Sequence, residues 1–171
     1  PVGQELSAML AYGLDQPTGA FRWANYLNET GKPEESLTWY AKAVEWDAGS
    51  APFRHQYAVA LSKLHRLDDA LAQLEQGERI APKDSIYPHS IGLLLAEMGR
   101  LPEARAALRR AVQLEPNQAR FWYNLGLAEN QAGDTAAALA ALEKAETLDP
   151  SAADYPFTRA TIYLALNQHD Q

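Results

Sequence analysis

The chain has 171 residues, of which 47% are hydrophobic and 22% charged, with a formal net charge of -7 and no cysteine. A negative charge of this size repels a phosphate backbone, so the composition argues against a nucleic-acid binder. The lack of cysteine excludes disulfides, thiol catalysis and cysteine-ligated metal sites, and no apolar run reaches the ~20 residues that a membrane-spanning helix needs.

Helix-forming residues dominate, and the spacing of apolar residues predicts helices throughout the chain. In chain order we expect a helix over 4–14, four pairs of helices, and a last helix over 153–166. The first reads as the second helix of an incomplete repeat over 1–16. The pairs then fill repeats over 17–50, 51–84, 85–118 and 119–152, and residues 153–171 hold the first helix of a fifth unit, or a capping helix, plus a tail.

A period of 34 residues underlies these divisions, because positions 34 apart share one character. A small column in the first helices reads Ala24, Ala58, Gly92, Gly126 and Ala160. A large column in the second helices reads Leu6, Tyr40, Leu74, Leu108 and Leu142. A glycine inside a helix costs ~1 kcal/mol relative to alanine, so Gly92 and Gly126 predict a close approach of two helices.

Short breaks separate the two helices of each pair. Gly31, Gly99 and Gly133 follow predicted first helices, where glycine adopts the left-handed conformation that ends a helix, and His65 lies in the corresponding turn of the second pair. Pro33 and Pro102 suit the first turn of the next helix. Each unit is therefore predicted to be a helix, a tight turn and a second helix, which buries its apolar face against its neighbours.

These features resemble the tetratricopeptide repeat. The resemblance is carried best by Trp122-x-x-Leu125-Gly126, Ala138, Leu142, Ala145 and Pro150, and almost as well by Ile91-Gly92, Gly99, Ala104, Leu108, Ala111 and Pro116. It implies an all-α fold, a right-handed α-α superhelix (solenoid) of stacked antiparallel helix pairs. One position departs from the pattern, because Glu129 stands where Leu27, Leu61 and Leu95 are apolar.

The two ends of the chain carry unpaired elements. Leu6, Met9 and Tyr12 are in register with second helices but have no first helix before them, whereas Ala160 and Tyr163 are in register with a first helix. We therefore expect a fragment of a larger protein, extending beyond at least one end.

Few residues are arranged as catalytic groups or metal ligands. His55 and His89 occupy equivalent places on neighbouring first helices, but a catalytic zinc needs a third ligand, so we expect no metal site and no cofactor. The nucleophile-elbow and phosphate-binding motifs are missing as well. The sequence therefore predicts a protein that is not an enzyme.

Four arginines, Arg100, Arg105, Arg109 and Arg110, fall in the turn and second helix of the third repeat. We expect them on the convex side, as a solvated face with ion pairs to nearby acidic residues. A patch for an acidic partner is the alternative.

The concave side of such a solenoid is lined by first helices and is where partners bind. Its most distinctive column is aromatic throughout: Phe21, His55, His89, Tyr123 and Phe157. With the flanking columns, the predicted partner-binding residues are Phe21, Arg22, Asn25, His55, Gln56, Val59, His89, Ser90, Leu93, Tyr123, Asn124 and Leu127. Rings and amides in this pattern could hold an extended peptide. Alternatively, the rings pack on one another and on adjacent first helices.

The predicted function is a non-catalytic scaffold that holds a peptide segment or partner domain in the concave groove. The partner would be a protein or peptide, with no nucleic acid and no membrane insertion. Relatives that clamp a C-terminal carboxylate use lysine, arginine and asparagine; here Phe21, Ile86 and Ser90 replace the basic residues and only Asn25 fits, so we expect no such clamp. Two alternatives remain: self-association (a homo-oligomer) through the end helices, and an accessory arm of a larger catalytic or redox protein.

Overall fold

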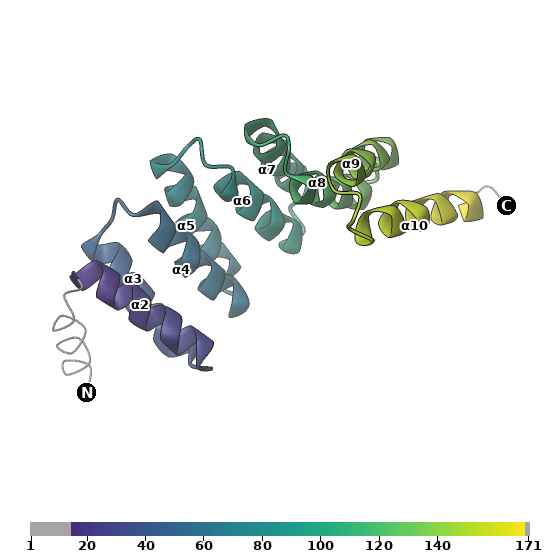
Figure 1. Ribbon diagram of the computed structural model, residues 1–171. Coiled ribbons are helices and arrows are strands. Elements are labelled where there is room, and N and C mark those ends of the chain that lie inside the picture. The colour runs from purple at the N-terminus through teal and green to yellow at the C-terminus, as the bar shows by residue number, and fades with distance from the viewer. Residues whose placement is uncertain (1–14, 170–171) are drawn as a thin grey trace. The chain divides into compact units, whose positions relative to one another are not determined.

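Figure 1 shows the computed structural model, which describes residues 15–169. All regular structure in this range is helical, which confirms the all-α fold class. The expected helix over 4–14 lies outside the described residues. The helices are α2 (Gln16–Glu29), α3 (Pro33–Trp46), α4 (Ala51–Lys63), α5 (Leu67–Ile80), α6 (Ile86–Glu97), α7 (Leu101–Leu114), α8 (Ala119–Gln131), α9 (Thr135–Leu148) and α10 (Asp154–His169).

Local sequence signals set the helix boundaries. Gly31, Gly99 and Gly133 have φ of 81°, 74° and 83°, so each occupies the left-handed region where a first helix ends. In the second pair His65 takes this place with φ of 56°, a conformation that costs energy for a residue with a Cβ. In the turn between α8 and α9, Asp134 follows Gly133 and begins the next helix. Its carboxylate accepts a hydrogen bond from the Ala137 backbone N–H at 3.1 Å and caps α9.

The chain divides into two compact units, and the first ends at Pro82. Within its described part, α2 pairs with α3, α4 pairs with α5, and α3 packs on α4. The small residues Ala24 and Ala58 of the first helices are buried, and so are Tyr40 and Leu74 of the second helices.

The second unit begins at Lys83. Here α6 pairs with α7, α8 pairs with α9, and both α7 against α8 and α9 against α10 form the contacts between successive pairs. A Cβ placed on Gly92 would lie 2.5 Å from Leu108 Cγ, and one placed on Gly126 would lie 2.9 Å from Leu142 Cγ. The predicted close approach at the two glycines is therefore confirmed.

No helix between residues 15 and 169 has both the length and the apolar character needed to cross a bilayer.

Candidate partner-binding surface

In the first unit, two of the predicted residues pack inside an aromatic cluster. The Phe21 ring of α2 stacks on the Phe53 ring of α4 with centroids 4.5 Å apart, and the Tyr40 ring of α3 meets Phe21 edge-on at 5.9 Å. The Tyr40 hydroxyl donates a hydrogen bond to Asn25 Oδ1 at 2.5 Å. Phe21 and Asn25 are both half-buried, so they brace α2 against α3 and α4 as well as bordering the surface.

The remaining predicted residues of this unit are more accessible. Arg22 and Gln56 are exposed, while His55 and Val59 are half-buried. The exposed polar groups among the predicted residues of this unit are therefore the Arg22 guanidinium on α2 and the Gln56 amide on α4.

In the second unit, the structure brings His89 of α6 and Asn124 of α8 together. Asn124 Nδ2 lies 2.8 Å from His89 Nε2. With the amide N–H as donor, His89 Nε2 accepts and the ring carries its proton on Nδ1. The His89 ring also stacks on Phe121 with centroids 4.2 Å apart, and it is only 7% exposed. For His89 the structure therefore favours the alternative that the ring packs between first helices.

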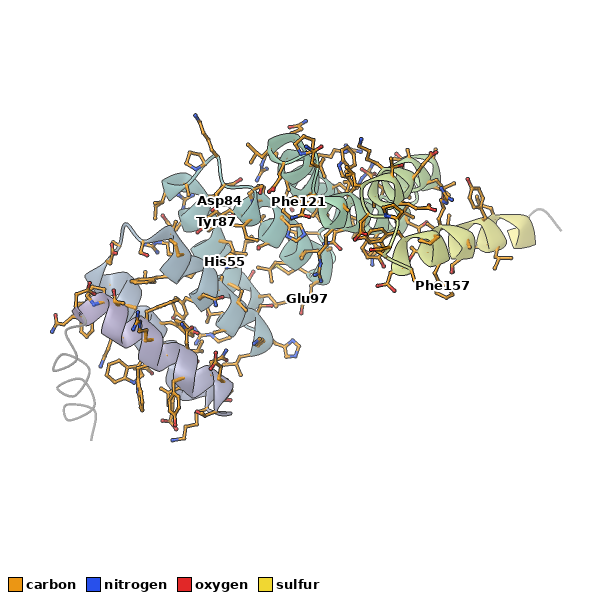
Figure 2. The ribbon with its side chains drawn as sticks, in the orientation of Figure 1. His55, Asp84, Tyr87, Glu97, Phe121 and Phe157 are labelled. Atoms are coloured by element: carbon orange, nitrogen blue, oxygen red, sulfur yellow. The ribbon has the colours of Figure 1, made fainter. Side chains whose placement is uncertain are left out.

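Tyr123 continues the same arrangement from α8 to α10. Its ring lies against Tyr155 at a centroid distance of 4.9 Å, and its hydroxyl lies 3.3 Å from Thr158 Oγ1. The last ring of the aromatic column differs, because Phe157 of α10 is 75% exposed (Figure 2).

Sequence analysis missed the partner rings. Phe53, Phe121 and Tyr155 each lie 32 residues after the ring that they contact, Phe21, His89 and Tyr123. Together with Tyr87 they form a second aromatic column with the same 34-residue period, and Tyr87, Phe121 and Tyr155 are buried. Stepping the period from Phe53 would have revealed this column, though not which ring meets which.

The buried phenols of these clusters are not poised for proton transfer. Burial raises the pKa of Tyr40 to about 12, with a smaller contribution from the negative charge of Glu29. Burial likewise raises the pKa of Tyr87 to about 12, with help from Asp84, and raises the pKa of Tyr155. All three side chains are therefore neutral near pH 7, as their packing requires.

Three predicted residues of the second unit border solvent beside the packed rings. Leu93 of α6 is 42% exposed, and Ser90 and Leu127 are half-buried. Leu93 and Leu127 are one period apart on α6 and α8, so an apolar strip with polar neighbours follows the first helices.

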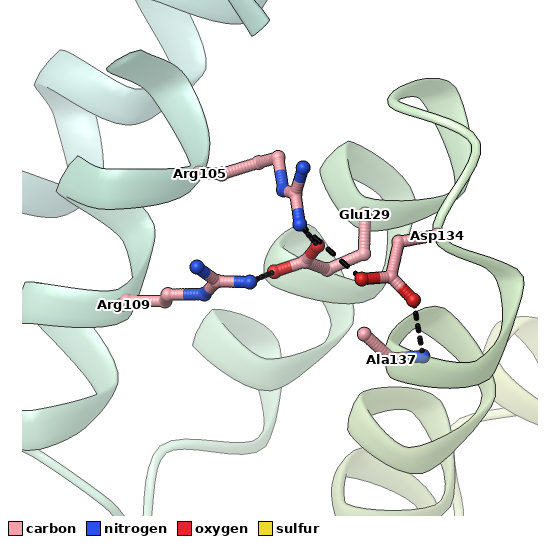
Figure 3. Close-up of polar contacts among 5 residues, drawn as sticks. All are labelled: Arg105, Arg109, Glu129, Asp134 and Ala137. Atoms are coloured by element: carbon pink, nitrogen blue, oxygen red, sulfur yellow. Dashed lines mark hydrogen bonds and ion pairs between the residues drawn. The ribbon is translucent and has the colours of Figure 1, made fainter. Parts of the chain in front are cut away.

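The arginines of α7 are arranged differently from the expectation. Arg100 does form a local, exposed pair with Glu103 at 2.6 Å. Arg105 and Arg109, however, both reach the carboxylate of Glu129 on α8, each at 2.6 Å, and Glu129 is only 2% exposed (Figure 3). Both arginines thus form the expected ion pairs with an acidic residue, and the Arg109 side chain stays 51% exposed. The solvated-face prediction is wrong for Arg105, which is only 23% exposed, because its guanidinium packs against the buried charge at the position where the repeat pattern failed.

Arg105 also lies 3.4 Å from the carboxylate of Asp134, the residue that caps α9 (Figure 3). This cluster connects α7, α8 and the start of α9. Residues 15–169 contain no group of three or more histidine, aspartate or glutamate side chains arranged to hold a metal ion.

Comparison with known proteins identifies the family to which this architecture belongs. Two family models, both described as tetratricopeptide repeat, match residues 27–90 and 89–153. No curated protein matches the sequence.

Solved structures share the fold. MamA (41-end) from Desulfovibrio magneticus RS-1 is 21% identical with a TM-score of 0.82, covering 92% of this chain and 89% of that one. PilF from Pseudomonas aeruginosa is 22% identical with a TM-score of 0.77, covering 89% and 69%. YrrB, described as a TPR protein with an unusual peptide-binding site, is 21% identical with a TM-score of 0.71, covering 87% and 77%. Likeness at this level of identity concerns the fold alone.

Proposed function

Since the chain belongs to the tetratricopeptide repeat family, we propose that it is a non-catalytic scaffold that holds a peptide segment or partner domain along its first helices. Its general character as a protein-interaction scaffold follows from the family. The groove and the residues that line it are the proposal.

The observation that carries this proposal is the exposed apolar strip of the second unit. Leu93 keeps 42% of its surface in water although α6 is otherwise largely apolar and packed. Leu127 lies one period further on α8, and Ser90 and Asn124 lie next to the strip with polar side chains. Apolar contact flanked by hydrogen-bonding groups suits an extended peptide, whose side chains need the first and whose backbone needs the second.

The packed rings support the surface indirectly. The His89–Phe121 stack and the Tyr123–Tyr155 contact fix the spacing of α6, α8 and α10. A surface held rigid before binding loses less entropy when the partner binds. In this proposal, His89 and Tyr123 position the surface, while Leu93 and Leu127 contact the partner.

A peptide-display selection against the immobilised chain tests the proposal. Selected peptides should bind the wild type, and their affinity should fall at least about tenfold in Leu93→Glu, which places a charge in the strip. Leu114→Glu on α7 is the matched control, since Leu114 is also an exposed leucine but belongs to a second helix. Both variants should keep wild-type helicity by circular dichroism.

Two results would count against the groove: failure to select any peptide, or peptides that bind Leu93→Glu as well as they bind the wild type. Loss of binding in Leu114→Glu alone would indicate that the binding site lies on the second helices.

A further inference from the structure

A groove of about 400 Å³ lies between α7 and α9 over α8, and we call it the α7–α9 groove. Apolar side chains make up most of its lining, among them Val112, Trp122, Leu125, Ala140 and Ala141. Val112, Leu125 and Ala141 are each 5% exposed and belong to one core cluster, on which the half-buried Trp122 packs. Ala140 is exposed at the edge, so a side chain from another molecule can reach this core surface.

The α7 edge of the groove carries a guanidinium. Arg109 donates one terminal nitrogen to Glu129 at 2.6 Å, and 51% of its side chain stays exposed (Figure 3). Glu129 is only 2% exposed and also pairs with Arg105, which in turn pairs with Asp134 outside the groove lining. The charge that this edge presents to water is therefore positive, because the carboxylate is buried and the guanidinium is not.

The first unit has a groove of about 460 Å³ in a related place, lined by α3, α4 and the turn after α4. Its lining includes Ala41, which lies two periods before Arg109. Its charged residues are Glu34 and Arg66, which are opposite in sign, and Arg66 pairs with Asp69 at 2.6 Å. A groove on this side thus occurs in both units, whereas the positive edge distinguishes the α7–α9 groove and favours a partner with a carboxylate.

The α7–α9 groove and the peptide-binding strip lie on opposite sides of α8. At 100° per residue, Trp122, Leu125 and Glu129 share one side of the helix, and Asn124 and Leu127 share the other. A partner in the groove leaves the strip accessible, so either proposal can fail without the other.

We propose that the α7–α9 groove is a second partner site, and that it binds an acidic helical peptide segment. In that segment an apolar side chain, leucine or phenylalanine, lies one helical turn from a carboxylate. The apolar side chain packs on Val112 and Trp122, and the carboxylate pairs with Arg109. Arg109 and Val112 are themselves one turn apart on α7, so a helix lying along α7 presents its two groups at the matching spacing.

The test uses synthetic alanine-based helical peptides that carry leucine or phenylalanine one turn from glutamate, in both orders, and the same peptides with glutamine in place of glutamate. Binding to the isotope-labelled 171-residue chain is followed by NMR at the Trp122 indole N–H, which donates to the Pro116 carbonyl at 2.8 Å. Trp122→Phe identifies that signal. At least one glutamate peptide should shift it saturably and bind at least about tenfold more tightly than its glutamine counterpart.

Two pairs of variants assign the binding to the groove. Ala140→Tyr fills the groove and should abolish the shift, whereas Ala106→Tyr, at the same repeat position on α7 but outside the lining, should bind like the wild type. Arg109→Gln should bind the glutamine peptide as the wild type does but lose the preference for glutamate. Arg110→Gln removes the same charge from the next residue and should keep that preference. Circular dichroism should show unchanged helicity in all four.

Three results would overturn the proposal. The first is that no glutamate peptide shifts the Trp122 signal saturably up to about 1 mM. The second is that glutamate and glutamine peptides bind equally, which would mean that the groove takes a neutral apolar partner. The third is unchanged binding in Ala140→Tyr, with shifts at Leu93 and Leu127, which would place the acidic peptide on the first helices.

Discussion

Gly92 on α6 lies beneath the side chain of Leu108 on α7, with no room for a Cβ between them. Gly92→Ala should therefore destabilise the protein, although alanine favours helix by ~1 kcal/mol. The added carbon would meet Leu108 Cγ at 2.5 Å, and such overpacking costs about 1–3 kcal/mol. Gly126→Ala, with a 2.9 Å approach to Leu142, should lose less. Denaturant unfolding measures both, and a Gly92→Ala variant as stable as wild type would contradict the close approach.

The Glu129 carboxylate depends on its two arginines. Arg105→Leu should lower the free energy of unfolding by about 2–3 kcal/mol, less than the ~3–5 kcal/mol of a fully stripped buried pair because Arg109 remains at 2.6 Å. Glu129→Leu should cost less than about 1 kcal/mol, because an apolar residue of similar size removes the buried charge. Denaturant unfolding of both variants provides the measurement. A greater loss in Glu129→Leu than in Arg105→Leu would show that the ion pairs themselves stabilise the fold.

Alkaline pH should weaken the first unit through Tyr40. Its pKa is raised to about 12 in the folded protein, whereas a phenol in an unfolded chain has a pKa of about 10. The folded state therefore holds the proton more tightly, so this contribution is complete below about pH 10 and is lost as pH rises toward about 12. Tyr40→Phe removes the hydrogen bond to Asn25 and should cost about 0.5–1.5 kcal/mol at pH 8.

The same Tyr40→Phe variant should lose less stability than wild type between pH 8 and pH 11, which denaturant unfolding at the two pH values would show. Tyr87 serves as the internal reference, because its pKa is also raised to about 12 and it stays in both proteins. An identical decline in wild type and variant would mean that Tyr40 ionises normally in the folded state.

The two kinds of aromatic residue should respond differently to truncation. Phe121→Ala removes a buried ring that stacks on His89, and should cost about 3–5 kcal/mol. Phe157→Ala removes a ring in water and should change stability by no more than about 0.5 kcal/mol in dilute, monomeric protein. Thermal unfolding followed by circular dichroism compares them. Similar losses for the two variants would mean that the Phe157 ring is packed in solution.

Sequence sufficed for the features that are encoded locally or repeated by the period. The left-handed turns at Gly31, Gly99 and Gly133 could be predicted because glycine marks them residue by residue. The close approach at Gly92 and Gly126 could be predicted because only packing explains a glycine at mid-helix.

Contacts between successive helix pairs were harder to predict from the sequence. Phe21 stacks on Phe53, which lies two residues before His55, the residue one period after Phe21, and neither composition nor the period predicts that offset. Glu129 was visible as a misfit, but its partners are 24 and 20 residues earlier on a second helix, a relation that depends on how far α7 is rotated about its own axis. For the same reason, the division of the aromatic column into a buried His89 and an exposed Phe157 could not be read from their shared register.

The constant offset between contacting rings limits what the connecting loops can tolerate. His89 reaches Phe121 32 residues later and Asn124 35 residues later, and both contacts span the short link between α7 and α8. One residue inserted at 115–118 would leave every ring and every hydrogen-bonding group chemically intact. If the link could not bulge outward to absorb it, α8 would begin rotated by about 100°, and Arg120 would take the place of Phe121. The length of this loop is therefore as important for the contacts between helices as the identity of the side chains. We expect homologous chains to vary their surface residues more freely than the number of residues in this link.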